Sequence, residues 1–297
     1  MSAAGPSGMP RQAGTLVLVA TPIGNLGDLS PRAVEVMASA DVVACEDTRH
    51  TGRLLVHAGV RARRLVSLHG HNEAARLDEL LAVLASGETV ALVSDAGTPL
   101  VSDPGERLVA AAIAAGVEVT AVPGPSAVLA AVVLSGLGTS RWRYEGFLPR
   151  KGAERRARLV EIAASPEPVV CYESPRRLAA TLSDLTEVCG GERRVAVARE
   201  LTKLHEEVWR GPLAEAAARA AAGEPRGEHV IVVAGAVSAA RPSGEALTGA
   251  LERLIAAGLA RREAVLAAEV LLGVARREAY RAALALGPLE KPAPAPS

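Results

Sequence analysis

One loop has the residue types best suited to holding a small ligand against the main chain. It reads Ser94-Asp95-Ala96-Gly97-Thr98-Pro99-Leu100-Val101-Ser102-Asp103-Pro104-Gly105 and is called the 94–105 loop below. An apolar run over 89–93 predicts a buried strand before it, and an alanine-rich run over 106–115 predicts a helix after it. Small residues let a ligand approach backbone N–H and C=O groups, and open α/β sheets bind ligands at the carboxyl ends of their strands. This loop is therefore the main candidate for a binding site.

Other predicted strands also end in polar residues. Glu46-Asp47-Thr48-Arg49-His50 follows the strand expected at 42–45, where it either faces the same crevice or forms a turn closed by an Asp47–Arg49 ion pair. Ser126 could hold a carboxylate at a helix N-terminus or simply cap that helix. Neither pair of alternatives is decided by the sequence.

Metal and nucleotide motifs are weak in this chain. His69 and His71 have no third ligand spaced with them, and catalytic zinc needs three protein ligands, so no metal is expected. The loop over 20–28 contains only G-x-x-G, which lacks the dinucleotide fingerprint and disfavours a nicotinamide dehydrogenase. The phosphate-binding G-x-x-x-x-G-K-[ST] pattern is absent, which excludes a P-loop hydrolase.

Aromatic residues lie directly before a basic run. Trp142, Tyr144 and Phe147 precede residues 149–158, which contain five basic residues and one acidic residue. Aromatic rings can stack on bases while cations hold phosphates, so the pattern fits a nucleic-acid strand. The alternative is a set of core aromatics followed by a solvated helix face.

Composition gives broader limits. The chain has 297 residues, of which 49% are hydrophobic and 22% charged, so it is expected to be globular. Its net charge is zero, so the whole protein has no general electrostatic attraction to nucleic acid. Three scattered cysteines, without a C-x-x-C pair, fit a reducing cytoplasm. No apolar stretch reaches the roughly 20 residues that span a bilayer.

The order of elements predicts an α/β protein. Apolar runs alternate with helical patterns over 15–122, which indicates a mostly parallel sheet with helices on both faces. We expect a disordered extension at 1–14, α/β domains at 15–135 and 136–237, a helix-turn-helix-like tail at 238–286 and a disordered end at 287–297.

Seven collinear motifs resemble one known family. They are A-T-P-I-G-N-L-G-D, E-D-T-R-H-T, S-D-A-G-T-P-L-V-S-D-P-G, V-P-G-P-S-A, G-F-L-P-R-K, Y-E-S-P-R-R-L and A-R-E-L-T-K-L-H-E-E. The match that they carry runs in order from about Thr15 to Gly235. Together they look like the ribosomal RNA small-subunit methyltransferase I family, a branch of the tetrapyrrole-methylase superfamily. The tail also resembles the small helical domain that ends many of its members.

The resemblance implies a fold, a reaction and partners. It implies two α/β domains with S-adenosylmethionine in the cleft between them, and no metal. The methyl acceptor would be the ribose 2′-hydroxyl of a cytidine in the decoding region of small-subunit ribosomal RNA, met as free RNA or in the 30S subunit. A cytoplasmic homodimer is also implied. By motif match, the cofactor residues would be Asp95, Ala96, Gly97, Thr98, Pro99, Val101, Ser126, Ala127, Tyr172 and Thr202.

Methyl transfer to a hydroxyl benefits from a base, and RNA needs cations. The base candidates are Glu46, Asp47 and Glu200, because carboxylates at strand ends can accept the proton. The phosphate-binding candidates are Arg150, Lys151, Arg155, Arg156 and Arg176. Two alternatives stay open: a methyltransferase acting on a precorrin-type tetrapyrrole, and a non-catalytic RNA-binding assembly factor.

Overall fold

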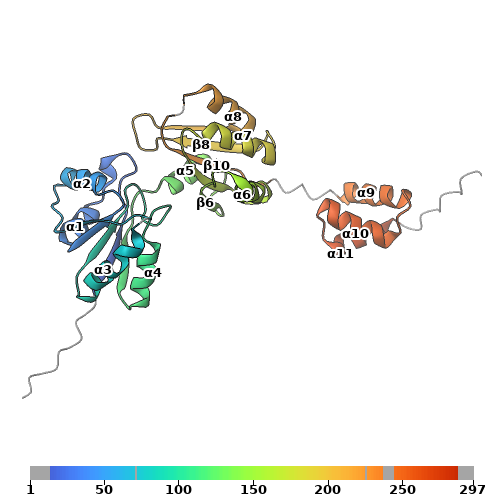
Figure 1. Cartoon of the computed structure of the whole chain (residues 1–297). Helices are drawn as coiled ribbons and strands as arrows, with labels where there is room; N and C mark the ends of the chain where they lie inside the picture. Colours follow the sequence, from blue (N-terminus) through green and yellow to red (C-terminus); the bar gives the residue numbers. More distant parts are fainter. Residues whose placement is uncertain (1–13, 71, 225, 237–243, 287–297) are drawn as a thin grey trace, which may run out of the picture. The chain divides into compact units, whose positions relative to one another are not determined.

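The computed structural model describes residues 14–70, 72–224, 226–236 and 244–286 (Figure 1). The chain divides into two compact units, with the boundary after Gly235. His71, residues 1–13 and residues 287–297 lie outside the described residues. Gly14, the last residue of the expected N-terminal extension, is described and buried, and its N donates to Leu84 O at 2.8 Å. None of the described helices is long and apolar enough to cross a lipid bilayer.

The first unit begins with a parallel five-stranded sheet, as the sequence predicts. Its strands are β1 (Thr15–Val19), β2 (Val42–Cys45), β3 (Leu65–Ser67), β4 (Val90–Val93) and β5 (Glu118–Val122), in the spatial order β3-β2-β4-β1-β5. The central strands β2 and β4 are buried along their whole length, since helices cover both faces.

Four α-helices cover this sheet. They are α1 (Pro31–Ser39), α2 (Thr48–His57), α3 (Glu73–Ala85) and α4 (Glu106–Ala114), and a short 3-10 turn, η1 (Leu26–Asp28), precedes α1. Helices α1 and α2 pack on one face and α3 and α4 on the other. Helix α1 starts where its sequence favours a start, because the Ser30 hydroxyl accepts from Ala33 N and Pro31 occupies the first turn.

The second sheet is mixed. Its strands are β6 (Arg143–Phe147), β7 (Val169–Glu173), β8 (Arg194–Arg199), β9 (Glu207–Pro212) and β10 (His229–Val233), in the order β6-β7-β10-β8-β9. Only β6 and β7 pair in parallel. The sequence analysis does not predict β6 or β9, because both are rich in polar or aromatic residues and lack a clear apolar run.

Helices cover both faces of the second sheet as well. They are α5 (Ala127–Ser135) on one face and α6 (Gly152–Ala164), α7 (Leu178–Cys189) and α8 (Leu213–Ala222) on the other. The expected boundary after residue 135 assigns α5 to the first domain, whereas α5 packs on the second sheet. Its buried Val128, Ala131 and Val132 contact strands of that sheet, which explains the difference.

The second unit is a bundle of three short helices. Helices α9 (Gly244–Ala256), α10 (Arg261–Leu272) and α11 (Arg276–Ala285) surround a core that includes Leu247, Leu251 and Val265. This unit therefore has its own hydrophobic core.

Candidate active site

A cavity of about 380 Å³ lies between the two sheets of the first unit and is called the cleft cavity below. This volume is within the range of roughly 300–1,000 Å³ that is typical of small-molecule sites. Its walls come from the loops that follow β1, β4, β7 and β8, from the ends of β6, β7 and β8, and from the starts of α5 and β10. The lining residues are Ile23, Ala96, Val101, Ser102, Asp103, Ala127, Phe147, Tyr172, Glu173, Ser174, Pro175, Ala198, Leu201, Glu228, His229 and Val230.

The strand order explains why the 94–105 loop opens into this space. Strands β1 and β4 are neighbours in the sheet, and the connections that follow them run in opposite directions. The connection from β1 leads to β2, on the far side of β4, and the connection from β4 leads to β5, on the far side of β1. The helices that follow them, α1 and α4, lie on opposite faces of the sheet. Such a switch point leaves a crevice outside the carboxyl ends of the two strands. The 94–105 loop lies at this crevice.

The 94–105 loop is tied to neighbouring loops. Gly97 and Thr21 exchange backbone hydrogen bonds (N···O 2.9 and 3.1 Å), and the Thr98 hydroxyl donates to the Pro125 carbonyl at 3.2 Å. Gly97 has φ of +89°, and a Cβ there would be 3.3 Å from Ile23 Cγ2. Glycine is therefore required both by the backbone angle and by the close packing.

Backbone strain is concentrated around the cleft cavity. Among the described residues, those other than glycine with positive φ are Leu100, Ser102, Glu200 and Thr202. All four lie in the 94–105 loop or in the loop that follows β8, and each conformation costs on the order of 1–3 kcal/mol. Thr202 Oγ1 also accepts from Asn25 N at 3.1 Å, which joins the loops of the two sheets.

The ten predicted cofactor residues fall into two groups. Four of them line the cleft cavity: Ala96, Val101, Ala127 and Tyr172. The other six, Asp95, Gly97, Thr98, Pro99, Ser126 and Thr202, are not in its wall. Of these six, Ser126 caps α5, because its hydroxyl accepts from Leu129 N. This is the helix-cap role that the sequence analysis offered as the alternative to holding a carboxylate.

Asp95 points toward the loop that follows β2. Both carboxylate oxygens are 3.2 Å from Asp47 N, which donates to them, and the Thr51 hydroxyl is 3.5 Å away. Asp95 thus fixes the start of α2 relative to the 94–105 loop. The ion pair considered from the sequence is also present, because Arg49 Nη2 lies 3.0 Å from Asp47 Oδ2.

The three predicted base candidates differ in their surroundings. The hydrogen bond from Arg49 lowers the pKa of Asp47 to about 2, so its carboxylate is a weak base. A hydrogen bond from Glu228 N lowers the pKa of Glu200, which also pairs with Lys203 Nζ at 3.0 Å. Partial burial, followed by the charges of Asp103 and Asp95, raises the pKa of Glu46. None of the three lines the cleft cavity.

Asp103 is a carboxylate that the sequence analysis did not select. It lines the cleft cavity and also a small hollow that contains Glu46 and Asp95. Burial raises the pKa of Asp103, and its Oδ2 accepts from the Ser94 hydroxyl. The sequence signal that could have identified Asp103 as a site residue is its position in the 94–105 loop, directly before Pro104-Gly105 and the start of α4.

Aromatic rings form the wall contributed by the second sheet. The rings of Tyr144 and Phe147 lie 5.6 and 5.3 Å from that of Tyr172. Tyr144 Oη is 2.7 Å from Ser102 Oγ, so this wall also contacts the 94–105 loop. Trp142 and Tyr144 pack in the core beside α5, whereas Phe147 is 55% exposed. Trp142 and Tyr144 thus fit the core alternative drawn from the sequence, and Phe147 is the ring that stays accessible at the surface.

Arg155 corrects one predicted RNA contact. It is only 8% exposed, and its guanidinium donates to Asp184 Oδ2 (2.7 and 2.9 Å), the Pro149 carbonyl (3.0 Å) and Thr181 Oγ1 (3.0 Å). The helical spacing of α6 turns this arginine inward toward α7. Because its donors are used inside the protein, Arg155 is not available to an RNA phosphate, and that prediction was wrong.

The other four basic candidates lie on the surface. Arg150, Lys151, Arg156 and Arg176 are exposed, and none forms an ion pair with a residue that the structure describes. Arg150 and Lys151 follow β6, and Arg176 follows β7, so three of them extend from the parallel strands that carry Phe147 and Tyr172. Free cations thus lie near the exposed aromatic ring.

Among the described residues, no group of three or more His, Cys, Asp and Glu side chains could hold a metal ion. His69 of the predicted histidine pair is described, and its backbone N donates to Asn72 Oδ1 at 2.8 Å. The cysteines Cys45, Cys171 and Cys189 are free thiols.

Comparisons with known proteins agree with this architecture. Residues 15–217 match the model of the Tetrapyrrole (Corrin/Porphyrin) Methylases. The chain is 50% identical over 253 residues to "Ribosomal RNA small subunit methyltransferase I" of Synechocystis, covering 84% of this chain and 90% of that protein. The chain belongs to the ribosomal RNA small-subunit methyltransferase I family, a branch of the tetrapyrrole methylases. A relative of the same name from Pseudomonas aeruginosa is 46% identical over 279 residues, or 92% of this chain and 97% of its own.

A solved structure with a different name has the same fold. Uroporphyrin-III C-methyl transferase from Thermus thermophilus, complexed with S-adenyl homocysteine, matches with a TM-score of 0.54. It is 19% identical and covers 74% of this chain and 97% of its own. The family resemblance drawn from the seven motifs and the predicted α/β fold are therefore confirmed.

Proposed function

We propose that this chain transfers a methyl group from S-adenosylmethionine to the ribose 2′-hydroxyl of a cytidine in the decoding region of small-subunit ribosomal RNA. The observation that supports this most is the cleft cavity, formed by family motifs in a chain half identical to relatives named for small-subunit RNA methylation. S-adenosylmethionine, when bound, supplies a methyl group that its sulfonium already activates. The protein has to hold the donor, place the acceptor and remove a proton.

The cleft cavity has the chemistry to hold this donor. Ile23, Val101 and Leu201 give apolar surface for a flat adenine ring, and Ala96 and Ala127 leave room for it. The left-handed Gly97 keeps the loop close to Ile23 without a side chain in between. We assign direct contact to Ala96, Val101, Ala127 and Tyr172. The supporting residues are Asp95, Gly97, Thr98, Pro99, Ser126 and Thr202, which shape the loops.

Asp103 is the carboxylate best placed to accept the hydroxyl proton. Unlike Glu46, Asp47 and Glu200, it lies in the cavity wall. The hydrogen bond from Ser94 holds its carboxyl group, and its raised pKa makes it a stronger base than an exposed aspartate. A positioned base contributes roughly 10²–10⁴-fold to such a reaction.

The RNA strand would approach over the surface near Phe147. Arg150, Lys151, Arg156 and Arg176 can hold phosphates there, since no described residue neutralises them. Phe147, which is 55% exposed, offers a ring on which a base can stack. Ribosomal RNA in the 30S subunit as substrate implies that the protein works in the cytoplasm.

A homodimer is part of the proposal. Helix α5 is apolar around its whole circumference: Val128, Ala131 and Val132 face the second sheet, while Leu129 and Val133 are 54% and 66% exposed. A helix of this kind is normally covered on all sides. A second copy of the chain would cover it, and sedimentation equilibrium of the full chain measures this; a monomer at micromolar concentration would contradict it.

The reaction is tested with the purified chain, S-adenosylmethionine and 30S subunits that lack the modification. After digestion of the RNA to nucleosides, mass spectrometry is expected to detect 2′-O-methylcytidine. A precorrin offered in parallel is expected to remain unmethylated. Methylated precorrin with unchanged RNA would identify a tetrapyrrole enzyme, and the absence of any methylated product with intact donor binding would contradict both activities.

A further inference from the structure

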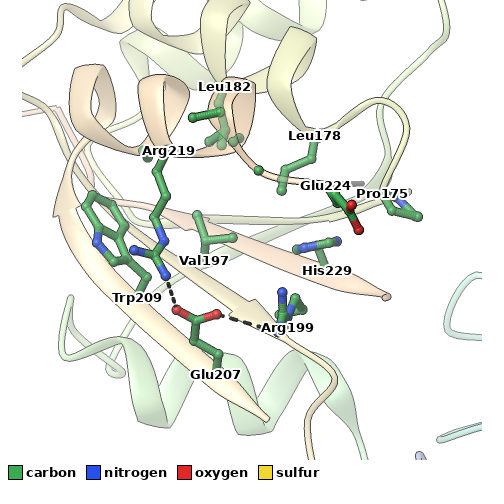
Figure 2. Close-up of a pocket in the computed structure, with 14 residues that line it drawn as sticks. Pro175, Leu178, Leu182, Val197, Arg199, Glu207, Trp209, Arg219, Glu224 and His229 are labelled. Carbon is green, nitrogen blue, oxygen red and sulfur yellow. Dashed lines mark hydrogen bonds and ion pairs between the residues drawn. The ribbon is translucent and has the colours of Figure 1, made fainter. Parts of the chain in front are cut away.

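A second cavity lies on the opposite face of the second sheet, under α7 and α8 (Figure 2). Its volume is also about 380 Å³, and it is called the back cavity below. Leu178 and Leu182 of α7, Val197 of β8 and Trp209 of β9 give it apolar and aromatic walls. Two family motifs reach this cavity with Pro175, Leu178, Arg199 and Glu207, and the proposed function assigns no role to these four residues.

Two buried polar atoms in the back cavity lack partners among the described residues. His229 is 5% exposed, and its Nδ1 makes no hydrogen bond. Arg199 Nε is buried and also has no acceptor. A buried polar atom without a partner costs free energy, so each such atom needs a specific reason.

The two atoms have complementary hydrogen-bonding roles. Burial and the nearby charge of Arg199 lower the pKa of His229, so the imidazole is neutral near pH 7. A neutral imidazole carries its proton on one ring nitrogen, so Nδ1, which has no partner among the described residues, can accept a hydrogen bond from a ligand when the proton is on Nε2. Arg199 Nε is a donor. Residues 199 and 229 are direct cross-strand partners of β8 and β10, so their side chains share one face of the sheet.

The charged groups of the back cavity largely neutralise one another. Arg219 Nη2 lies 2.5 Å from Glu207 Oε1, and Arg199 Nη2 lies 3.8 Å from Glu207 Oε2. Figure 2 shows the Glu207 carboxylate between the two guanidinium groups, with Glu224 elsewhere on the lining. Two arginines and two glutamates give no net attraction for a phosphate or a carboxylate. A neutral, flat ring with one acceptor and one donor fits this lining better.

We propose that the back cavity binds a nucleobase of the RNA substrate, next to the nucleotide that is methylated. Every nucleobase has a donor and an acceptor on adjacent edge atoms, which would satisfy His229 Nδ1 and Arg199 Nε. Trp209 gives an aromatic wall, and base–aromatic contacts are tolerant of sequence. His229 and Pro175 line both cavities, so a base here lies beside the reaction site. The exposed Arg176 follows Pro175 and can hold the adjoining phosphate.

The proposal rests on the proposed function for its RNA source, but its first test does not need activity. Trp142→Phe leaves Trp209 as the one tryptophan. Adding cytidine or adenosine 5′-monophosphate to this otherwise intact chain is expected to quench Trp209 fluorescence with saturation. Quenching should persist with saturating S-adenosylhomocysteine. No saturable quenching, or its loss with S-adenosylhomocysteine, would overturn the proposal.

A filled back cavity gives the second test. Ala220 of α8 lines the cavity, so Ala220→Leu is expected to abolish the quenching and raise the KM for 30S subunits about tenfold, with kcat and the KM for S-adenosylmethionine unchanged. Ala218→Leu, on the exposed side of the same helix, is the matched control and should change neither.

The two proposals fail in different ways. An unchanged KM for 30S subunits in a folded Ala220→Leu protein would overturn the base-binding role while leaving the methyltransferase activity in place. A wild-type chain without activity on RNA would instead overturn the proposed function, and saturable quenching by the monophosphates would still report on the back cavity.

Discussion

The two cavities on opposite faces of the second sheet have similar volumes and different construction. The cleft cavity is formed mainly by loops, with small residues such as Ala96 and Ala127 and with strained backbone at Ser102. The back cavity is formed by side chains of regular helices and strands, including Leu182 and Trp209. Only Pro175 and His229 line both of them.

The difference shows two ways of making a binding site. A loop of small residues offers its backbone, and it tolerates little added bulk because the chain path itself forms the wall. A cavity under helices offers side-chain atoms, and its shape depends on how the helices pack. Substitutions in each region should therefore affect different measured quantities.

The largest effect is expected in the cleft cavity, from Asp103→Asn. If Asp103 accepts the hydroxyl proton, kcat falls by about 10²–10⁴-fold while donor affinity is kept. The raised pKa predicts that wild-type kcat is full above that pKa and declines as pH falls through it, because the protonated carboxyl cannot accept a proton. The variant should lack this decline. Steady-state rates across pH measure both.

Asp47→Asn is the matched control for Asp103→Asn. Asparagine caps helices as well as aspartate does, and the pKa of Asp47 of about 2 leaves it ionised throughout the useful pH range. We expect less than a tenfold change in kcat, because the helix cap is kept and Asp47 is not in the cavity wall. If Asp47→Asn lost the activity and Asp103→Asn kept it, the base would lie in the loop after β2.

The next effect concerns the helices behind the second sheet. Arg155→Met removes the donor that joins α6 to Asp184 and Thr181 of α7, and Thr181 in turn donates to the buried Glu173 at 2.6 Å. We expect a loss of about 3 kcal/mol in the free energy of unfolding, at the low end for a broken buried pair because Asp184 is 40% exposed. Urea denaturation measures it.

Arg156→Met, one position along the same helix, is the control for Arg155→Met. Arg156 is exposed, so its replacement should leave the denaturation midpoint unchanged and weaken RNA binding instead. Equal midpoints for the two variants would contradict the structural role of Arg155.

The smallest effect is expected from Gly97→Ala. The new Cβ would lie 3.3 Å from Ile23 Cγ2 at a backbone angle that disfavours alanine, so the 94–105 loop must shift. We expect the affinity for S-adenosylmethionine to fall about tenfold, which equals roughly 1.4 kcal/mol. Isothermal titration calorimetry measures this affinity.

Gly116→Ala separates backbone strain from damage to the site. Gly116 has a similar φ of +74°, with nothing within 4 Å of an added Cβ, and it follows α4 away from the cleft cavity. It should lose stability with unchanged donor affinity. A comparable loss of affinity in both variants would show that the close contact with Ile23 is unimportant.

The sequence predicted most of what depends on local pattern. The apolar runs at β2 and β4 and the 94–105 loop are recorded in neighbouring residues, so the parallel first sheet and the main loop could be found without a structure. Strand β9 could not, because Glu207, Trp209 and Gly211 form a sheet face only once β8 lies beside them.

The sequence by itself determined the family, through seven collinear motifs. It also determined the loop that forms one wall of the cleft cavity, because a run of small residues directly after a buried strand is a local feature of the chain. Only the tertiary structure decided which charged side chains face outward and which are buried. Arg155 and Arg156 are adjacent in a basic run, yet the helix turns one toward α7 and the other to solvent. The pairing of His229 with Arg199, 30 positions apart, likewise exists only because β8 and β10 are neighbours in the sheet.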